Sequence, residues 1–155
     1  MPAPRVTVLM SVYNDGLFLP LAVQSILAQT FPDFEFLIID DGSTDDSIAY
    51  LSQLRDPRVR VVRHPQNLGL TQSLQHGVEL AQGEYLARLD ADDLATPDRL
   101  ARQVDYLDQH PAIGLLGSAA RKIDEAGRSR SFYRVPLNQL HVRWKIGRAS
   151  CRERV

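Results

Sequence analysis

The chain alternates short apolar runs with segments whose apolar residues recur at helical spacing, and this alternation constrains its fold more than any other feature. Continuous apolar runs, such as residues 6–10 and 34–39, are typical of parallel strands covered on both faces. Further strands are expected at residues 58–63 and 85–89, and a helix follows each of these strands. At 155 residues the chain suits one domain. The pattern predicts an α/β fold, a three-layer sandwich with a mostly parallel central sheet and residues 6–10 inside it.

Helical spacing and polar flanks add local expectations. Ser43 or Thr44 is expected to cap the second helix and Thr71 the third. The arginines of residues 58–63 are expected to face solvent from a strand near the sheet edge. Inward-facing side chains are predicted at Phe18, Leu21, Ala22 and Ile26 in the first helix, at Leu74, Val78 and Ala81 in the third, and at Leu100, Val104 and Leu107 in the fourth.

Three expected strands end in polar residues, at positions 11–14, 40–43 and 90–93. In an open parallel sheet, ligands bind at the carboxyl ends of the strands, near the point where the strand order reverses. We therefore expect these three strand ends to converge on one crevice.

The strand end at 90–93 places three carboxylates, those of Asp90, Asp92 and Asp93, within four residues. Crowded like charges repel and raise one another's pKa, so the run favours a bound cation. An isolated Asp-x-Asp is more often a solvated turn that caps the next helix, but the second acidic strand end at residues 40–41 favours the cation. Mg²⁺ and Mn²⁺ prefer such oxygen ligands, together with phosphate oxygens. Asp41, on a different strand, is better suited to accept hydrogen bonds from a base or sugar.

The sequence lacks the motifs of other common nucleotide-binding and hydrolase sites. The chain contains neither Gly-x-Gly-x-x-Gly after the first strand, nor Gly-x-x-x-x-Gly-Lys-Ser/Thr, nor Gly-x-Ser-x-Gly. Its four histidines show no metal-ligand spacing and are expected at the surface, and its one cysteine, Cys151, cannot form an internal disulfide. A net charge of −1 without long blocks of one sign gives no support for nucleic acid binding. Without a lysine cluster, a bound diphosphate would need a metal to neutralise it.

Several of these stretches together resemble the family 2 glycosyltransferases. The resemblance extends over residues 6–145 and implies the A-type glycosyltransferase fold, binding of a nucleotide-diphosphosugar through Mn²⁺ or Mg²⁺, and transfer of the sugar to an acceptor hydroxyl with inversion. The stretches that follow the family's order and spacing are residues 7–14, 29–31, 39–45, 67–70, 83–85 and 89–93, with Pro97.

The resemblance also implies roles for single residues. Ser11 and Tyr13 would line the nucleotide pocket, and Asp41 would contact uracil or an equivalent base. Asp90 would reach the ribose and the metal, and Asp92 would be the metal ligand. The implied donor is by preference a UDP-sugar, and the implied acceptor is a saccharide or a lipid-linked molecule in polysaccharide biosynthesis.

The location is expected to be cytoplasmic. The sequence has no apolar run of ~18 residues and no signal-peptide pattern at its start. A peripheral association with the inner face of the membrane stays open for the full-length protein.

The end of the chain departs from the family pattern. Beyond the fourth helix we expect a buried strand at 113–116, a strand at 131–135 and an amphipathic segment at 137–145. Family members continue into an acceptor half that supplies the catalytic base, and nothing after Lys145 resembles it. Residues 1–145 are therefore interpreted as an incomplete donor-binding domain without its base, truncated at the carboxyl end.

Residues 146–155 are interpreted as a non-native tail that resembles a translated sequencing adaptor. Two alternatives to sugar transfer stay open. One is a metal-dependent nucleotidyl or phosphoryl transferase on a similar sheet, and the other is a non-catalytic module that binds sugar nucleotides.

Overall fold

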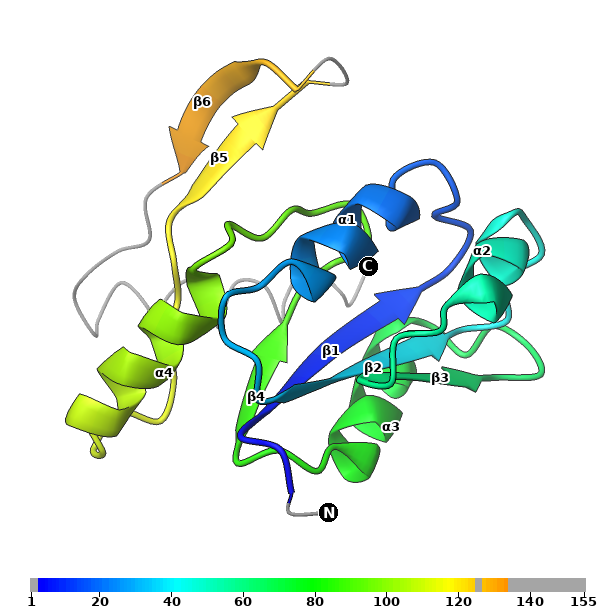
Figure 1. Ribbon diagram of the computed structural model, residues 1–155. Coiled ribbons are helices and arrows are strands. Elements are labelled where there is room, and N and C mark those ends of the chain that lie inside the picture. Colours follow the sequence, from blue (N-terminus) through cyan, green and yellow to red (C-terminus); the bar gives the residue numbers. More distant parts are fainter. Residues whose placement is uncertain (1–2, 125–126, 134–155) are drawn as a thin grey trace. The chain divides into compact units, whose positions relative to one another are not determined.

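The computed structural model describes residues 3–124 and 127–133 (Figure 1). The chain consists of two compact units, Met1–His110 and Pro111–Val155. Within the described residues, the first unit contains a parallel sheet with helices and the second contains a β-hairpin. Those same residues include no helix long and apolar enough to cross a membrane.

The first unit is built on a four-stranded sheet in which every pairing is parallel. The sequence-based prediction of a parallel sheet is confirmed, with β1 inside it and β3 at an edge. The strand order reverses beside β1, because the chain moves from β1 to β2 and β3 on one side and later places β4 on the other. Along the sheet, the strands are β3 (Val59–Arg63), β2 (Phe34–Asp40), β1 (Val6–Val12) and β4 (Tyr85–Arg88).

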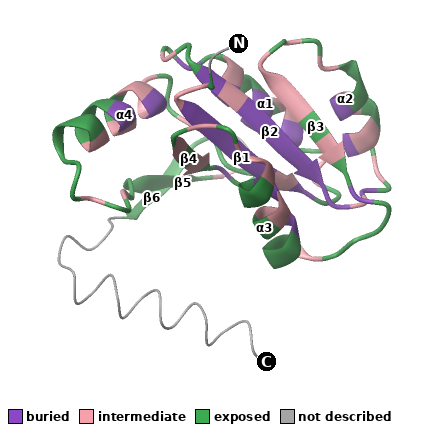
Figure 2. Ribbon diagram, turned by 90° about the horizontal axis from the view of Figure 1, so that it is seen from below, coloured by how far each residue is buried: buried purple, intermediate pink, exposed green. Residues whose placement is uncertain are grey.

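Helices cover both faces of this sheet, as predicted. α1 (Leu19–Leu27), α2 (Ser47–Gln53) and α4 (Arg99–Gln109) contribute to one core cluster, which includes Val8 and Met10 of β1. α3 (Leu70–Leu80) packs on the other face, where its leucines meet a smaller cluster of Leu9, Leu37 and Ile39. Successive residues of a strand point to opposite faces, so β1 serves both layers. Figure 2 shows β1 and β2 buried along their length.

The buried stripe of α1 differs from the prediction at two positions. Phe18 and Leu21 are 40% and 56% exposed, whereas Leu19 and Val23 are fully buried beside the predicted Ala22 and Ile26. Phe18 is the residue that precedes the helix. The helix is therefore rotated about its axis relative to the predicted stripe.

In α3 the prediction is wrong at Val78, which is 54% exposed, while Ser73 and Gly77 are buried. A Cβ added to Gly77 would overlap the side chain of Leu9. Small residues thus let α3 approach β1 closely, and a search for apolar spacing does not detect them. In α4, Leu100 and Val104 are buried as predicted and Leu107 is half-buried.

The predicted helix caps are also corrected. α2 begins only at Ser47, so neither Ser43 nor Thr44 caps it. Both residues instead bind the loop that follows β1, as described below. α3 begins at Leu70, directly after Gly69, and Thr71 lies inside the helix.

The arginines of residues 58–63 were predicted to face solvent. Arg63 is exposed, as predicted, whereas Arg58 and Arg60 are half-buried. Arg60 Nη2 binds Glu35 Oε2 at 3.1 Å and the carbonyl oxygen of Leu80 at 2.6 Å. Arg63 Nε lies 3.3 Å from Asp40 Oδ2. Both carboxylates belong to β2, the strand paired with β3, so Arg60 and Arg63 make cross-strand ion pairs.

The second unit contains β5 (Ala120–Ile123) and β6 (Ser129–Tyr133), which pair antiparallel. The strand predicted at 131–135 is thus found two residues earlier. The buried strand predicted at 113–116 is wrong, since that segment has no strand pairing and Leu115 is 73% exposed. The predicted segments at 137–145 and 146–155 lie outside the described residues.

Candidate functional site

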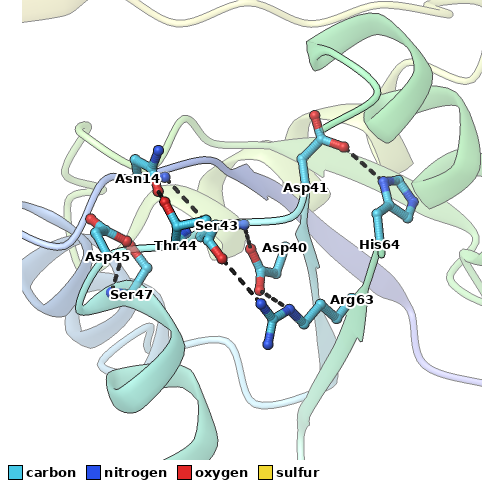
Figure 3. A network of polar contacts seen from close by, with 9 residues as sticks. All are labelled: Asn14, Asp40, Asp41, Ser43, Thr44, Asp45, Ser47, Arg63 and His64. Carbon is cyan, nitrogen blue, oxygen red and sulfur yellow. Dashed lines mark hydrogen bonds and ion pairs between the residues drawn. The ribbon is translucent and has the colours of Figure 1, made fainter. Parts of the chain in front are cut away.

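The loops that follow β1 and β2 are bound to each other at the carboxyl edge of the sheet (Figure 3). The backbone N–H of Asn14 donates to Ser43 Oγ at 3.1 Å, and the backbone N–H of Thr44 donates to Asn14 Oδ1 at 2.8 Å. The N–H of Gly16 donates to Asp45 Oδ2 at 3.0 Å. These bonds fix the position of the polar segment 11–14, which the sequence assigned to the crevice.

Asp40 has a structural role. Its carboxylate is 2% exposed, and Oδ1 accepts the N–H of Ser43 at 2.9 Å while Oδ2 faces Arg63. Both oxygens thus hold the turn after β2 and the end of β3.

Asp41 is 1% exposed and accepts three hydrogen bonds from the loop that follows β3. Oδ1 accepts from His64 Nδ1 at 2.8 Å and from the N–H of Leu68 at 3.0 Å, and Oδ2 accepts from the N–H of Gly69 at 2.8 Å. Burial alone would raise the pKa of Asp41. The hydrogen bonds from His64, Leu68, Ser73 and Gly69 outweigh it and hold the pKa below the ordinary aspartate value, so Asp41 is ionised at neutral pH.

His64 and His76 contradict the expectation that the histidines lie at the surface. His64 is only 5% exposed, because it packs between Asp41 and α3, and His76 is half-buried against it. His110 is exposed as expected, and His141 lies outside the described residues.

Carboxylates from the loops after β1 and β4 lie within electrostatic range of one another. Burial raises the pKa of Asp15, and the negative charges of Asp92, Asp45 and Asp90 raise it further. Burial likewise raises the pKa of Asp93, and the charges of Asp92 and Asp90 add to it. We call Asp15, Asp90, Asp92 and Asp93 the acidic crevice.

The sequence analysis missed Asp15. Its only signal was its position two residues after Tyr13 in a loop already assigned to the crevice. Its carboxylate accepts the N–H of Tyr13 at 3.1 Å, which turns the loop back on itself.

The remaining predicted site residues stand at the same edge of the sheet. Ser11 is half-buried near the end of β1, and Tyr13 is 48% exposed just beyond it. The N–H of Asp41 donates to the carbonyl of Val12 at 2.8 Å, so Asp41 and Tyr13 start from adjacent strand ends. Asp90 pairs with Arg88 at 2.9 Å and remains half exposed.

The donor chemistry of the acidic crevice fits a hard divalent cation. Within residues 3–124 and 127–133, no three His, Cys, Asp or Glu side chains are preassembled as a metal site. Mg²⁺ and Mn²⁺ typically take one or two protein carboxylates and complete their coordination with phosphate oxygens and water. A cation would also relieve the repulsion that raises the pKa values of Asp15 and Asp93.

Solved structures with the same fold are glycosyltransferases. Residues 1–349 of Staphylococcus aureus TarS, crystallised with UDP-GlcNAc, superpose with a TM-score of 0.66 at 24% identity, over 69% of this chain and 32% of that TarS fragment. The mannosyltransferase PcManGT from Pyrobaculum calidifontis, in complex with GDP-Man and Mn²⁺, gives a TM-score of 0.62 at 28% identity, over 68% of this chain and 32% of PcManGT. The first unit therefore has the A-type glycosyltransferase fold, as predicted.

The sequence matches the family described as Glycosyl transferase family 2 over residues 7–152, and the chain belongs to this family. The glycosyltransferase GlyG of Streptococcus pneumoniae serotype 4 is 35% identical over 114 residues, 70% of this chain and 38% of GlyG. An uncharacterized glycosyltransferase of Methanocaldococcus jannaschii, MJ1057, is 37% identical over 131 residues, 82% of this chain and 45% of that protein. The chain spans less than half of the length of these relatives.

Proposed function

We propose that the chain binds the nucleotide-diphosphosugar donor of an inverting, metal-dependent glycosyltransferase. Two observations carry this proposal. The loop after β1 is bound to the loop after β2 at the carboxyl edge of the sheet. In the acidic crevice, Asp15 after β1 lies within electrostatic range of Asp90 and Asp92 after β4. The crevice stands beside the reversal of strand order, where open parallel sheets bind ligands. The relative PcManGT, solved with GDP-Man and Mn²⁺, supports a donor and a cofactor of this kind.

Each predicted residue has a chemical task in this proposal. Asp92 and Asp90 hold Mn²⁺ or Mg²⁺, which when bound supplies positive charge to the departing nucleoside diphosphate. Asp41 accepts an N–H from the base, with a UDP-sugar as the preferred donor. Ser11 and the exposed ring of Tyr13 line the nucleotide pocket, and Asp90 also reaches the ribose.

Transfer further requires a base that takes the proton of the acceptor hydroxyl as this oxygen attacks the anomeric carbon. We assign no residue of this chain to that task and propose that 1–145 act as the donor-binding part, with 146–155 a non-native tail. The acceptor is proposed to be a saccharide or lipid-linked molecule of polysaccharide biosynthesis, met in the cytoplasm or at the inner membrane face.

Calorimetry tests the metal-dependent binding. UDP and GDP are titrated into the 155-residue chain with 5 mM EDTA or with about 1 mM Mn²⁺, and we expect binding only with the metal. Asp92→Asn should weaken Mn²⁺-dependent binding by at least about tenfold, on the scale of losing a charged ligand. The matched control is Asp105→Asn, an exposed carboxylate of α4 that accepts from Gln109. Equal affinity with EDTA and with Mn²⁺ would remove the metal from the proposal.

Product analysis separates the two alternatives. Nucleotide cleavage without sugar transfer by the full-length protein would favour a nucleotidyl or phosphoryl transferase. Donor binding without any turnover of the full-length protein would favour a non-catalytic module.

A further inference from the structure

Two histidines stand behind Asp41, in a part of the first unit to which the proposed function gives no role. His64 Nε2 lies 2.8 Å from Nδ1 of His76, which belongs to α3. The two ring planes differ by 18°, and the ring centroids are 5.1 Å apart. Since the nitrogens are much closer than the centroids, the rings meet edge to edge in nearly one plane. That is the geometry of a ring-to-ring hydrogen bond.

The partners of His64 restrict where its protons can be. An ionised carboxylate only accepts, so His64 must donate from Nδ1 to Asp41. The bond to His76 then has two possible forms. Either a neutral His64 accepts the Nδ1–H of His76, or a cationic His64 donates to a neutral His76.

Both forms accommodate at most one additional proton on the histidine pair. When both rings are protonated, an N–H faces an N–H across 2.8 Å and the contact breaks. Histidine is the side chain whose protonation ordinarily changes near neutral pH.

The other groups around the pair leave this arrangement intact. Ser73 Oγ lies 3.4 Å from His64 Nδ1, and its hydroxyl can either donate or accept. Arg63, the preceding residue, is paired with Asp40. His76 borders an open cavity of about 340 Å³, in which Glu79 of the same helix is the charged neighbour. His76 can therefore exchange protons with solvent, while His64, which also lines the cavity, is only 5% exposed.

We propose that His64 is a positioning residue for base recognition by Asp41, and that His76 makes this positioning sensitive to pH. The inference rests on the proposed function in that Asp41 is taken to contact the base. Because Asp41 is only 1% exposed, the donors that hold it decide which edge of the carboxylate meets a ligand. An ionised, acceptor-only carboxylate selects base edges that present an N–H, as uracil and guanine do.

The test is calorimetry of UDP with Mn²⁺ between pH 5 and 8, on the 155-residue chain and five variants. His64→Leu should weaken binding at pH 8 about tenfold, the scale of a lost hydrogen bond to a charged group. His64→Asn, which keeps an N–H donor but does not titrate, should recover most of that loss. The wild type should bind UDP more weakly as the pH falls toward 5. His76→Gln should bind at pH 8 within about threefold of the wild type and should lose part of this decline in affinity. His110→Gln, whose ring contacts Tyr106, is the control and should follow the wild-type profile.

The fifth variant, Asp41→Asn, separates this inference from the proposed function. If Asp41→Asn binds UDP like the wild type, the proposed base contact is wrong. If Asp41→Asn loses affinity while His64→Leu and His76→Gln match the wild type at every pH, the positioning role is wrong and the base contact stands.

Nitrogen-15 spectra of the imidazoles give a readout that needs no nucleotide and no variant of His64. We expect His64 to carry a proton on Nδ1 throughout the pH range. A neutral His64 protonated only on Nε2 could not donate to Asp41 and would overturn the inference, even if His64→Leu failed to fold.

Discussion

Asn14 accepts the backbone N–H of Thr44 through its Oδ1 at 2.8 Å, and so joins the loops that follow the two central strands. Its own N–H donates to Ser43 Oγ, and its backbone is left-handed, with φ at +57°. Asparagine tolerates this conformation better than most residues do. Asn14 therefore provides both the turn and the bonds that hold the loop after β1 against the loop after β2.

We expect Asn14→Ala to lower the free energy of unfolding by about 1–3 kcal/mol, from the lost hydrogen bond and the left-handed strain. Asn14→Gly loses the same bond without the strain, so its loss should be smaller. Urea denaturation of the wild type and the two variants measures the contribution of the hydrogen bond and that of the backbone strain. Equal losses for the two variants would mean that the backbone strain is negligible.

Gly42 packs closely against the loop after β3, whose residues Leu68 and Gly69 donate hydrogen bonds to Asp41. A Cβ on Gly42 would stand 2.6 Å from the carbonyl carbon of Gln66, and its φ is +74°. Gly127 has nearly the same φ, +73°, with nothing within 4 Å of the corresponding position.

Gly42→Ala and Gly127→Ala therefore share the left-handed strain, of about 1–2 kcal/mol, and differ in steric overlap. We expect Gly42→Ala to cost about 1–3 kcal/mol more, the usual scale of overpacking, and to weaken UDP binding as well. Thermal and urea unfolding compare the two variants. A Gly42→Ala protein as stable as Gly127→Ala would show that the loop yields without cost.

Asp15 gives a prediction about pH. Its pKa is raised in the folded protein, so the folded state binds its proton more tightly than the unfolded chain does. The free energy of unfolding should therefore fall as pH rises from the ordinary aspartate pKa through the raised one. Asp15→Asn should remove this fall and be more stable than the wild type at pH 7.

The stability difference between Asp15→Asn and the wild type should vanish at a pH where both the folded and unfolded carboxyl groups are protonated. Unfolding midpoints measured from pH 3 to 8 test this. Adding Mn²⁺ should reduce the stability difference between Asp15→Asn and the wild type at pH 7 if the acidic crevice binds the metal. A variant less stable than the wild type at pH 7 would contradict the sign of the shift.

The proposed division of tasks predicts that the 155-residue chain binds donor but transfers little or no sugar. A radiolabelled transfer assay, with several nucleotide sugars and saccharide acceptors, is run beside the binding measurement. Robust acceptor-dependent turnover would place the catalytic base within this chain, with Asp93, whose pKa is raised, as the first residue to mutate.

The sequence alone determined the order of elements from β1 to α4 and the positions of the polar strand ends. Apolar runs such as Val6–Val12 and Phe34–Asp40 are recognisable because a strand buried on both faces needs apolar residues at nearly every position. The acidic run around Asp90 and Asp92 was equally visible, since its residues are neighbours in the chain.

Only the tertiary structure decided which residues meet across the loops. Asp15 lies within electrostatic range of Asp92, and the ring of His64 contacts both Asp41 and His76. The buried face of α3 likewise depends on how closely Gly77 lets it approach Leu9. Local periodicity reports the conformation of one segment, whereas burial and charge depend on the neighbouring segments that pack against it.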